Sequence, residues 1–292
     1  MITVDRCVVC EGDLSVRATG LVAPFLAQRI WNRKAFPIKI MKCGGCGFEF
    51  FNPRLDAHEA KLLYDEYRGE RYQQMRFQHE PWYTEALNKG LSNEALMDSR
   101  RQLLESILSK HVALSDITSV LDFGGDQGQL IQDLPVAEKY VYDISGVEKR
   151  PGIVGISSFA ECLTRHYDLI VCSNVLEHVA FPRDLVSQMR QLAHPGTLLY
   201  LDAPLESPFS FMSIAKRIAQ ILIVCFARMR DALSLLRPSA LYLMHEHINF
   251  FATRSLANLA EHLDFEVVGT GRYDMKGPVL GGTCVWCLAR LK

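Results

Sequence analysis

Short apolar runs alternate with helix-like stretches along the C-terminal part of the chain, and this alternation constrains the fold more than any other feature. The runs read SVLDF, KYVYD, GIVGI, YDLIVCS, GTLLYLD, FEVVGTG and TCVWCLARL. Such alternation predicts a parallel sheet with helices on both faces. Ligands of such sheets bind at the carboxyl ends of the strands, so the residues that follow each run are the candidates for a site.

A glycine-rich turn follows the first run. The sequence LDFGGDQGQL places Gly124, Gly125 and Gly128 around an aspartate. Glycine lets the main chain approach a ligand closely, and a helix beginning after the turn would offer unpaired N–H groups. Asp143 ends the second run, where a carboxylate can accept hydrogen bonds from ribose hydroxyls. This arrangement predicts an adenosine-containing ligand.

NAD and S-adenosylmethionine both contain adenosine, and the residues of the turn distinguish them. The dinucleotide fingerprint is Gly-x-Gly-x-x-Gly, whereas this chain has Gly-Gly-Asp-Gln-Gly shortly after Asp122. A carboxylate at that place repels a pyrophosphate but attracts the cationic aminoacyl end of S-adenosylmethionine. The sequence therefore favours S-adenosylmethionine.

Two Cys-x-x-Cys pairs lie near the N-terminus, Cys7 with Cys10 and Cys43 with Cys46. Each pair can turn two thiolates toward one point, and two pairs complete the tetrahedral sulfur shell that zinc prefers. Glycines beside the second pair supply the positive φ angles that such a turn demands. We expect a structural zinc ion, because four thiolates leave no coordination position open for substrate. A redox role and plain buried cysteines are the alternatives.

Composition divides the chain into three segments. Residues 1–55 hold the cysteine pairs, and residues 56–111 are charged, poor in glycine and helical in period. Residues 112–292 hold the alternating runs, with an insertion at 205–244. We therefore predict a zinc-binding segment, a helical connector or cap, and an α/β domain with a helical insertion.

Charge and the N-terminal sequence bear on partners and location. The formal net charge of −1 gives no electrostatic reason to expect DNA or RNA. The first residues, MITVDRCVVC, lack the basic segment and apolar run of a secretory signal. We therefore expect the protein in a reducing cytoplasm, where disulfides are rare.

The insertion contains an amphipathic stretch at residues 209–236. Its polar stripe consists of Ser213, Lys216, Arg217, Gln220, Arg228 and Asp231. The uncharged run falls short of the ~20 residues that a bilayer core needs, so the stretch does not predict a membrane span. We expect a lid over the active site or a dimer contact, with a peripheral membrane helix as the alternative.

Four stretches together resemble class I S-adenosylmethionine-dependent methyltransferases: VLDFGGDQGQL, YDLIVCSNVLEHV, HPGTLLYLDAP and HEHINFFATRSLANLAEHLDFEVV. The group that the chain resembles most carries an N-terminal zinc-binding segment similar to CGGCGFEFFNPRLD and includes enzymes that methylate sugars and related small metabolites. The resemblance implies an α/β fold: a Rossmann-like, doubly wound sheet of seven strands with the last antiparallel, preceded by a small zinc-ribbon-like segment.

The resemblance also implies a set of cofactor-binding residues. These are Asp122, Gly124, Gly125, Gly128, Asp143, Ser157 and Asn174. By this resemblance Asp122, Gly124 and Gly128 hold the methionine end of S-adenosylmethionine, and Asp143 holds the ribose. Ser157 lies where the family contacts adenine. Asn174 belongs to the segment that walls the transferred methyl group. Asp126 stands where the family has glycine.

Catalytic candidates come from two segments. His178 ends the stretch SNVLEH that walls the methyl group. Methyltransferases that alkylate carbon in nucleotide-linked ketosugars show Tyr-His-Glu-His where this chain has Met244 followed by HEH. The match retains His247 as the candidate base, since histidine can take a proton near neutral pH, and Glu246 as its neighbour. Because the tyrosine is replaced, oxygen methylation competes with carbon methylation.

These observations together predict a methyltransferase that transfers a methyl group from S-adenosylmethionine to a small hydroxylated metabolite. A nucleotide-linked sugar or a related biosynthetic intermediate is the expected acceptor. Two alternatives from other classes are an NAD-dependent oxidoreductase and a non-catalytic zinc-ribbon binding protein on a degenerate methyltransferase fold.

Overall fold

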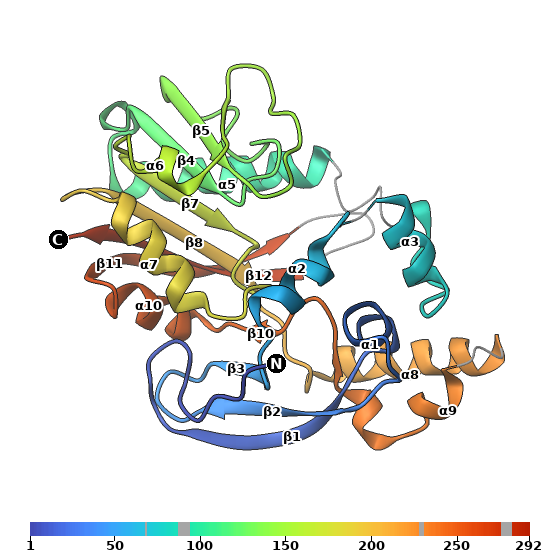
Figure 1. Ribbon diagram of the computed structural model, residues 1–292. Helices are drawn as coiled ribbons and strands as arrows, with labels where there is room; N and C mark the ends of the chain where they lie inside the picture. The colour runs from blue at the N-terminus through green and yellow to red at the C-terminus, as the bar shows by residue number, and fades with distance from the viewer. Residues whose placement is uncertain (68, 87–93, 228–230, 276–281) are drawn as a thin grey trace. The chain divides into compact units, whose positions relative to one another are not determined.

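The computed structural model describes residues 1–67, 69–86, 94–227, 231–275 and 282–292 (Figure 1). The chain forms two compact units. The first consists of Met1–Cys7, Glu11–Leu91 and Glu206–Phe250, and the second of Val8–Cys10, Ser92–Leu205 and Phe251–Lys292. The predicted insertion therefore folds with the N-terminal residues, and the predicted connector is divided between the units.

A seven-stranded sheet forms the second unit, in the order β11-β12-β8-β7-β4-β5-β6. Its strands are β4 (Ser119–Phe123), β5 (Glu138–Tyr142), β6 (Val154–Ile156), β7 (Leu169–Ser173), β8 (Leu198–Pro204), β11 (Phe265–Met275) and β12 (Gly282–Leu291). The strands from β4 to β8 pair in parallel, whereas β12 is antiparallel to both β8 and β11. The predicted Rossmann-like sheet with its last strand antiparallel is confirmed.

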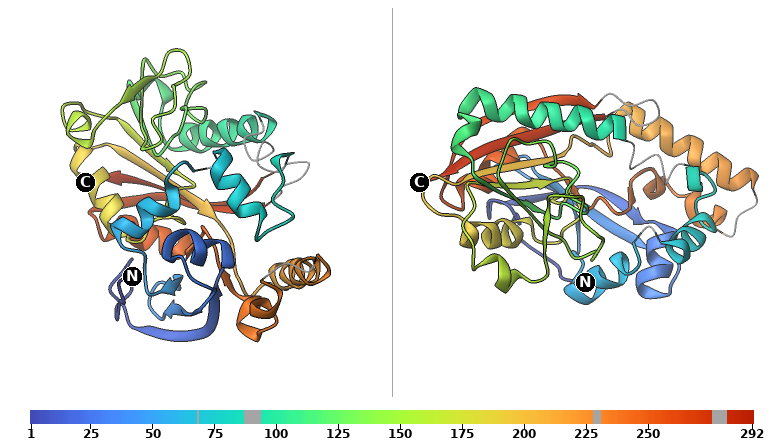
Figure 2. Two further views of the ribbon diagram at one scale, coloured as in Figure 1. Left: turned by 45° about the vertical axis from the view of Figure 1, so that its right-hand side comes forward. Right: turned by 90° about the horizontal axis from the view of Figure 1, so that it is seen from above.

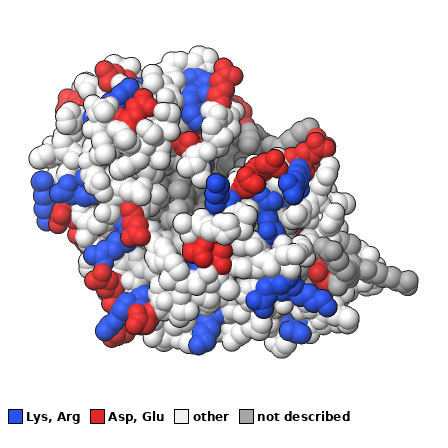
Figure 3. Space-filling view, in the orientation of Figure 1, with Lys and Arg blue, Asp and Glu red and all other residues white. Residues whose placement is uncertain are grey.

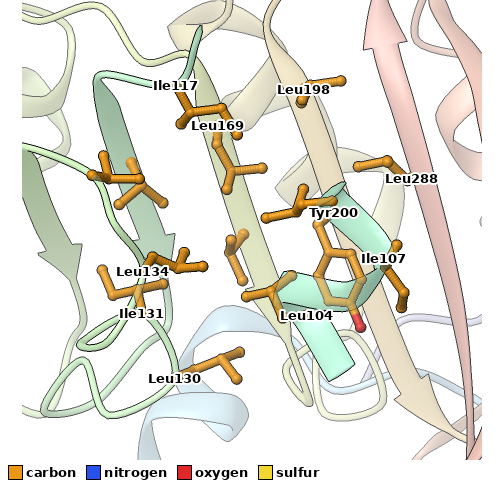
Figure 4. Packing of buried hydrophobic residues seen from close by; sticks show 14 of the residues in the cluster. Leu104, Ile107, Ile117, Leu130, Ile131, Leu134, Leu169, Leu198, Tyr200 and Leu288 are labelled. Atoms are coloured by element: carbon orange, nitrogen blue, oxygen red, sulfur yellow. The ribbon is translucent and has the colours of Figure 1, made fainter. Parts of the chain in front are cut away.

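Helices cover both faces of this sheet (Figure 2). They are α5 (Glu94–His111), η1 (Leu114–Asp116), α6 (Phe159–Cys162), α7 (Pro182–Leu192) and α10 (Thr253–Glu261). Leu104 and Ile107 of α5 pack with Leu169, Tyr200 and Leu288 of the strands in one buried cluster (Figure 4). The helix that the sequence analysis assigned to a connector is thus part of this core. Helices α7 and α10 lie on the opposite face (Figure 2).

The segment between β4 and β5, which the structure describes throughout, contains turns in place of the expected helix. Gly128 N–H donates to the Gly125 carbonyl at 2.7 Å, Ile131 to Gly128 at 3.2 Å, and Leu134 to Ile131 at 3.2 Å. These bonds span three residues, not the four of an α-helix. Asp126 (φ 51°) and Gly128 (φ 83°) are left-handed and interrupt a right-handed helix. The expectation of a helix here was wrong.

A five-stranded sheet forms the first unit, in the order β10-β3-β2-β1-β9. Its strands are β1 (Leu14–Val22), β2 (Pro37–Cys43), β3 (Glu49–Asn52), β9 (Leu243–Met244) and β10 (Asn249–Phe250), and its helices are α1 (Pro24–Trp31), α2 (Ala57–Tyr64), α3 (Glu70–Phe77), α8 (Phe211–Phe226), α9 (Ala232–Leu235) and η2 (Pro238–Leu241). β9, from the insertion, and β10, which follows the insertion in the sequence, occupy the two edges of this sheet. An added Cβ on Gly20 would lie 2.4 Å from the Tyr242 carbonyl oxygen, so glycine permits this approach.

The stretch predicted as one helix at 209–236 forms α8 and α9. Arg228, a member of the predicted polar stripe, lies with residues 229 and 230 outside the described residues. Of the helices that the structure describes, none is long and apolar enough to cross a membrane.

Candidate functional site

The turn after β4 has no room for side chains. An added Cβ on Gly124 (φ 82°) would lie 2.6 Å from Val175 Cγ2, and one on Gly125 would lie 2.3 Å from Asp122 Cγ. Gly128 also has a positive φ, 83°. Glycine is therefore required at each of these predicted positions, and the main chain of the turn stays bare, as a closely bound ligand needs.

Asp122 is the last residue but one of β4 and carries a buried carboxyl group, with 2% of its surface exposed. Its side chain makes no hydrogen bond to any residue that the structure describes. Burial raises the pKa of Asp122 from 3.8 to about 7, with Arg100 opposing the rise and the Asp143 and Asp202 carboxylates adding to it. A cationic ligand would stabilise the ionised form, so this residue fits the ammonium group of S-adenosylmethionine.

Asp143 follows β5 and connects the two neighbouring loops. Its Oδ2 accepts a hydrogen bond from Asp126 N–H at 3.0 Å, and its Oδ1 accepts one from Ser145 N–H at 2.7 Å. Each carboxylate oxygen has a second lone pair, so Asp143 can also accept from ribose hydroxyls. Because β4 and β5 are parallel neighbours, Asp122 and Asp143 both lie at the carboxyl ends of the strands.

Helix α6, which follows β6, contains an acidic residue that the sequence analysis missed. Ser157 N–H and Oγ both lie 3.0 Å from Glu161 Oε2, and Ser158 Oγ accepts from Glu161 N–H at 3.2 Å. The Ser-x-x-Glu spacing of a capping box is the signal that could have identified Glu161. A carboxylate thus lies beside Ser157, the residue predicted to contact adenine.

Asp202 of β8 is the centre of a buried hydrogen-bond cluster. Its side chain accepts from Ser173 Oγ at 2.6 Å, Asn174 N–H at 3.1 Å, Tyr200 Oη at 3.1 Å and Tyr273 Oη at 3.0 Å. Asn174, one of the predicted cofactor residues, is held in a left-handed conformation (φ 54°) by this cluster. The sequence analysis did not identify Asp202, because its partners come from separate strands.

Arg100 of α5 brings a cation to the same cluster. Its Nη2 donates to Ser173 Oγ at 2.5 Å and lies 3.8 Å from Asp202 Oδ1. Its Nε has no hydrogen-bond partner among the described residues. The carboxyl ends of the strands therefore bring together the guanidinium of Arg100 and the buried carboxyl groups of Asp122 and Asp202.

His178 lies in the turn after β7. Its N–H donates to the Val175 carbonyl at 3.0 Å, and 20% of its side chain is exposed. β7 is a parallel neighbour of β4, so the structure places this candidate at the predicted sheet edge.

The remaining catalytic candidates lie in the first unit. His247 Nδ1 lies 2.7 Å from Glu206 Oε2. Burial acts to raise the pKa of Glu206, but the hydrogen bond and charge of His247 outweigh it and lower that pKa. Glu246 is 9% exposed and forms an ion pair with Arg76 at 2.9 Å. Glu206 therefore orients His247, whereas Glu246 is held by a cation.

The two cysteine pairs form matching turns. Glu11 N–H donates to the Cys7 carbonyl at 2.9 Å, and Gly47 N–H donates to the Cys43 carbonyl at 3.1 Å. Glu11 (φ 57°) and Gly47 (φ 75°) occupy the same place, four residues after the first cysteine of each pair. Of the three glycines beside the second pair, Gly47 alone has a positive φ.

These turns bring the four sulfur atoms together. The Sγ atoms of Cys7, Cys10, Cys43 and Cys46 all lie within 4.8 Å of one another. The Cys7 and Cys46 sulfurs are 3.7 Å apart, close to the ~3.8 Å edge of a tetrahedron with zinc–sulfur bonds of about 2.3 Å. Cys7, Cys43 and Cys46 are buried. The donor set and its geometry fit a tetrahedral zinc ion.

Comparison with known proteins identifies one family. The family described as a methyltransferase domain matches residues 67–270. None of the curated proteins compared with the chain matches it.

Two solved structures illustrate the likeness of fold. Magnesium protoporphyrin IX methyltransferase from Synechocystis PCC 6803, with bound SAH, is 14% identical with a TM-score of 0.46, and the match covers 80% of this chain and 99% of that one. The N-methyltransferase NodS from Bradyrhizobium japonicum WM9 is 17% identical with a TM-score of 0.39, over 68% of this chain and 98% of that one. Sequence identities and TM-scores this low do not assign a substrate to this chain.

Proposed function

The chain belongs to the methyltransferase domain family, and we propose that it transfers a methyl group from S-adenosylmethionine to a small hydroxylated metabolite. The predicted enzyme class, an S-adenosylmethionine-dependent methyltransferase, is confirmed by this membership, which also removes the oxidoreductase alternative. We infer that the acceptor is a nucleotide-linked sugar or a related biosynthetic intermediate, methylated on oxygen or carbon.

One observation carries the choice of methyl donor. Asp122 is a buried carboxyl group at the end of β4, it has no hydrogen-bond partner among the described residues, and its pKa is raised to about 7. A pyrophosphate beside it would add like charge, whereas an ammonium group neutralises it. Gly124, Gly125 and Gly128 of the neighbouring turn carry no side chain, so a ligand can approach the main chain at these three positions.

S-adenosylmethionine would supply a methyl group carried on a sulfonium: the acceptor oxygen or carbon would attack the methyl carbon in line, and the carbon–sulfur bond would break to release S-adenosylhomocysteine. The enzyme has to hold donor and acceptor in that line and to exclude water between them. Asp143 would bind the ribose and Asp122 the ammonium group, and the main chain of Asn174 is fixed by its hydrogen bond to Asp202. Because these side chains are held rigidly, we infer that the enzyme accelerates methyl transfer mainly by orienting the donor and the acceptor.

His247 supports a hydroxyl as the reacting group. With Nδ1–H donating to Glu206, the tautomer of His247 leaves the lone pair on Nε2, which accepts the proton of the acceptor hydroxyl. The replacement of tyrosine by Met244 removes a phenol that carbon methylation of ketosugars would use, so oxygen methylation is favoured.

The four cysteines support a structural metal. Four thiolates fill a tetrahedral shell and leave no position for substrate. Zinc would fix the turns at Cys7 and Cys43 relative to each other.

The proposed acceptor class is tested with a panel of nucleotide sugars and the matching free sugars. The protein is incubated with S-adenosylmethionine labelled on the methyl group, and products are identified by mass spectrometry. We expect label on a hydroxyl oxygen of one nucleotide sugar. Label on a carbon atom would refute oxygen methylation, and binding of S-adenosylmethionine without methylation of any panel member would refute the acceptor class.

A further inference from the structure

The outward face of α8 is apolar. The most exposed large apolar side chains of α8, α9 and the residue that follows α9 are Phe211 (82%), Met212 (74%), Phe226 (86%), Leu233 (83%) and Leu236 (66%). Ile218, Leu222 and Ile223 are exposed by 46%, 51% and 44%. Residues 211, 215, 218, 222 and 226 fall on one side of a helix, and all of them are apolar in this chain.

The inward face of α8 carries polar residues. Val224 is buried, and with Ile221 it packs against Leu21 and Ala240 of the same unit. Ser213, Arg217 and Gln220 lie on this partly buried side. A surface helix of a globular protein turns its apolar stripe to the core and its polar stripe to water. α8 presents its widest apolar surface to solvent, so this surface indicates a partner.

The segment around this face is strongly basic. Residues 207–242 contain five basic residues (Lys216, Arg217, Arg228, Arg230 and Arg237) and one acidic residue, Asp231, a net charge of +4. Asp231 Oδ2 lies 2.7 Å from His79 Nδ1 and its side chain is 14% exposed, so the acid is turned toward the protein. Figure 3 shows the basic and acidic side chains on one face of the molecule.

We propose that this face binds the surface of a membrane that contains anionic lipids. The exposed Phe, Leu and Met side chains enter the boundary between headgroups and acyl chains, and the exposed basic side chains of Lys216 and Arg237 meet lipid phosphates. α8 has 16 residues and is about 24 Å long, so it lies in the plane of the headgroups. A second copy of the chain on this face would bring two segments of like charge together, which disfavours a dimer.

Vesicle flotation of the full-length protein tests this proposal. Vesicles of phosphatidylcholine alone are compared with vesicles that also contain phosphatidylglycerol, at low and high salt. The apolar contact is tested with Leu222→Asp, and the charge contact with Lys216→Glu. Leu163→Asp is the matched control, because Leu163 is 50% exposed and lies in the second unit.

We expect binding to the anionic vesicles that weakens at high salt, and little binding to neutral ones. Leu222→Asp should weaken binding by about tenfold or more, and Lys216→Glu by at least about fivefold, while Leu163→Asp binds as the wild type. Unchanged melting temperatures would show that the substituted proteins are folded. Absence of binding to anionic vesicles, equal loss in the control, or a dimer that Leu222→Asp dissociates would each overturn the proposal.

Discussion

Asp126 N–H donates a hydrogen bond to Asp143 Oδ2 at 3.0 Å, which joins the turn after β4 to the end of β5. The residue that departs from the family's glycine pattern thus contacts the carboxylate assigned to the ribose. Asp126 adopts the left-handed conformation (φ 51°) that glycine would adopt more readily. The substitution is therefore tolerated by the backbone.

The first prediction concerns Asp143. Asp143→Ala should weaken binding of S-adenosylmethionine by about ten- to a hundredfold, because one charge-assisted hydrogen bond contributes about 1.5–3 kcal/mol. Asp116→Ala, at an exposed position before β4, is the control and should bind normally. Calorimetric titration measures both. Equal affinity of Asp143→Ala and the wild type would place the ribose elsewhere.

The second prediction concerns the glycine turn. Gly125→Ala should abolish tight cofactor binding, since its Cβ would lie 2.3 Å from Asp122 Cγ and force the turn to move. Gly155→Ala is the matched control, because its Cβ meets only the flexible Lys149 side chain, at 3.1 Å. The same titration compares the two variants. If both bind alike, the turn does not contact the cofactor.

The third prediction concerns the metal. The purified protein should contain close to one equivalent of zinc, and Cys43→Ser should lose it and lower the stability of the first unit. Cys225→Ser should keep the metal, because Cys225 lies on α8 outside the cysteine cluster. Elemental analysis and thermal unfolding provide the readouts. Metal-free protein that is folded and active would contradict the assignment.

The fourth prediction concerns the proton acceptor. His247→Ala should lower turnover by about 10²- to 10⁴-fold, the usual contribution of a general base, and leave cofactor affinity nearly unchanged. Glu206→Gln should lower turnover to a smaller degree, because the amide retains a hydrogen bond to Nδ1 but loses the charge. His58→Ala, on α2, is the control. Turnover is measured per folded, cofactor-binding molecule, and normal turnover of His247→Ala would leave His178 as the next candidate.

The sequence predicted those parts of the fold and site that depend on local pattern. The alternating runs became the seven-stranded sheet, and Gly124, Gly125 and Gly128 proved sterically required. Both cysteine pairs were identified by spacing alone. Each of these features depends on residues that lie a few positions apart in the chain, so the pattern of the sequence is enough to predict it.

Long-range pairs could not be predicted in this way. Glu206 and His247 are 41 residues apart, and Arg76 and Glu246 are 170 apart, so no local pattern joins them. The insertion at 205–244 was predicted to be helical, but it also contains strand β9, which pairs with β1, and it is followed by β10, which pairs with β3. Whether such a short strand pairs at the edge of a sheet depends on the strands already in that sheet. The β-propensity of its own residues does not contain this information.

The fifth prediction concerns stability and pH. The pKa of Asp122 rises from 3.8 to about 7 on folding, so the folded state binds this proton more tightly than the unfolded state. The resulting stabilisation is fully present below pH 3.8 and is lost as the pH rises through about 7. Without cofactor, Asp122→Asn should therefore gain stability relative to the wild type between pH 5 and pH 8, by a few kcal/mol at most. Urea unfolding of both proteins at pH 5 and at pH 8 measures their free energies of unfolding. A difference between the two proteins that is the same at both pH values would contradict the raised pKa of Asp122.

The central claim is that the ionised Asp122 receives the ammonium group of S-adenosylmethionine. The most direct measurement is the affinity of the protein for S-adenosylmethionine at pH 6 and pH 8, for the wild type and for Asp122→Asn. A carboxyl group with a pKa of about 7 must lose its proton to bind a cation, so wild-type affinity should be about tenfold tighter at pH 8 than at pH 6. Asp122→Asn should bind more weakly and without this pH dependence. Wild-type affinity that is equal at both pH values, or an Asp122→Asn variant that binds as tightly as the wild type at pH 8, would contradict the account.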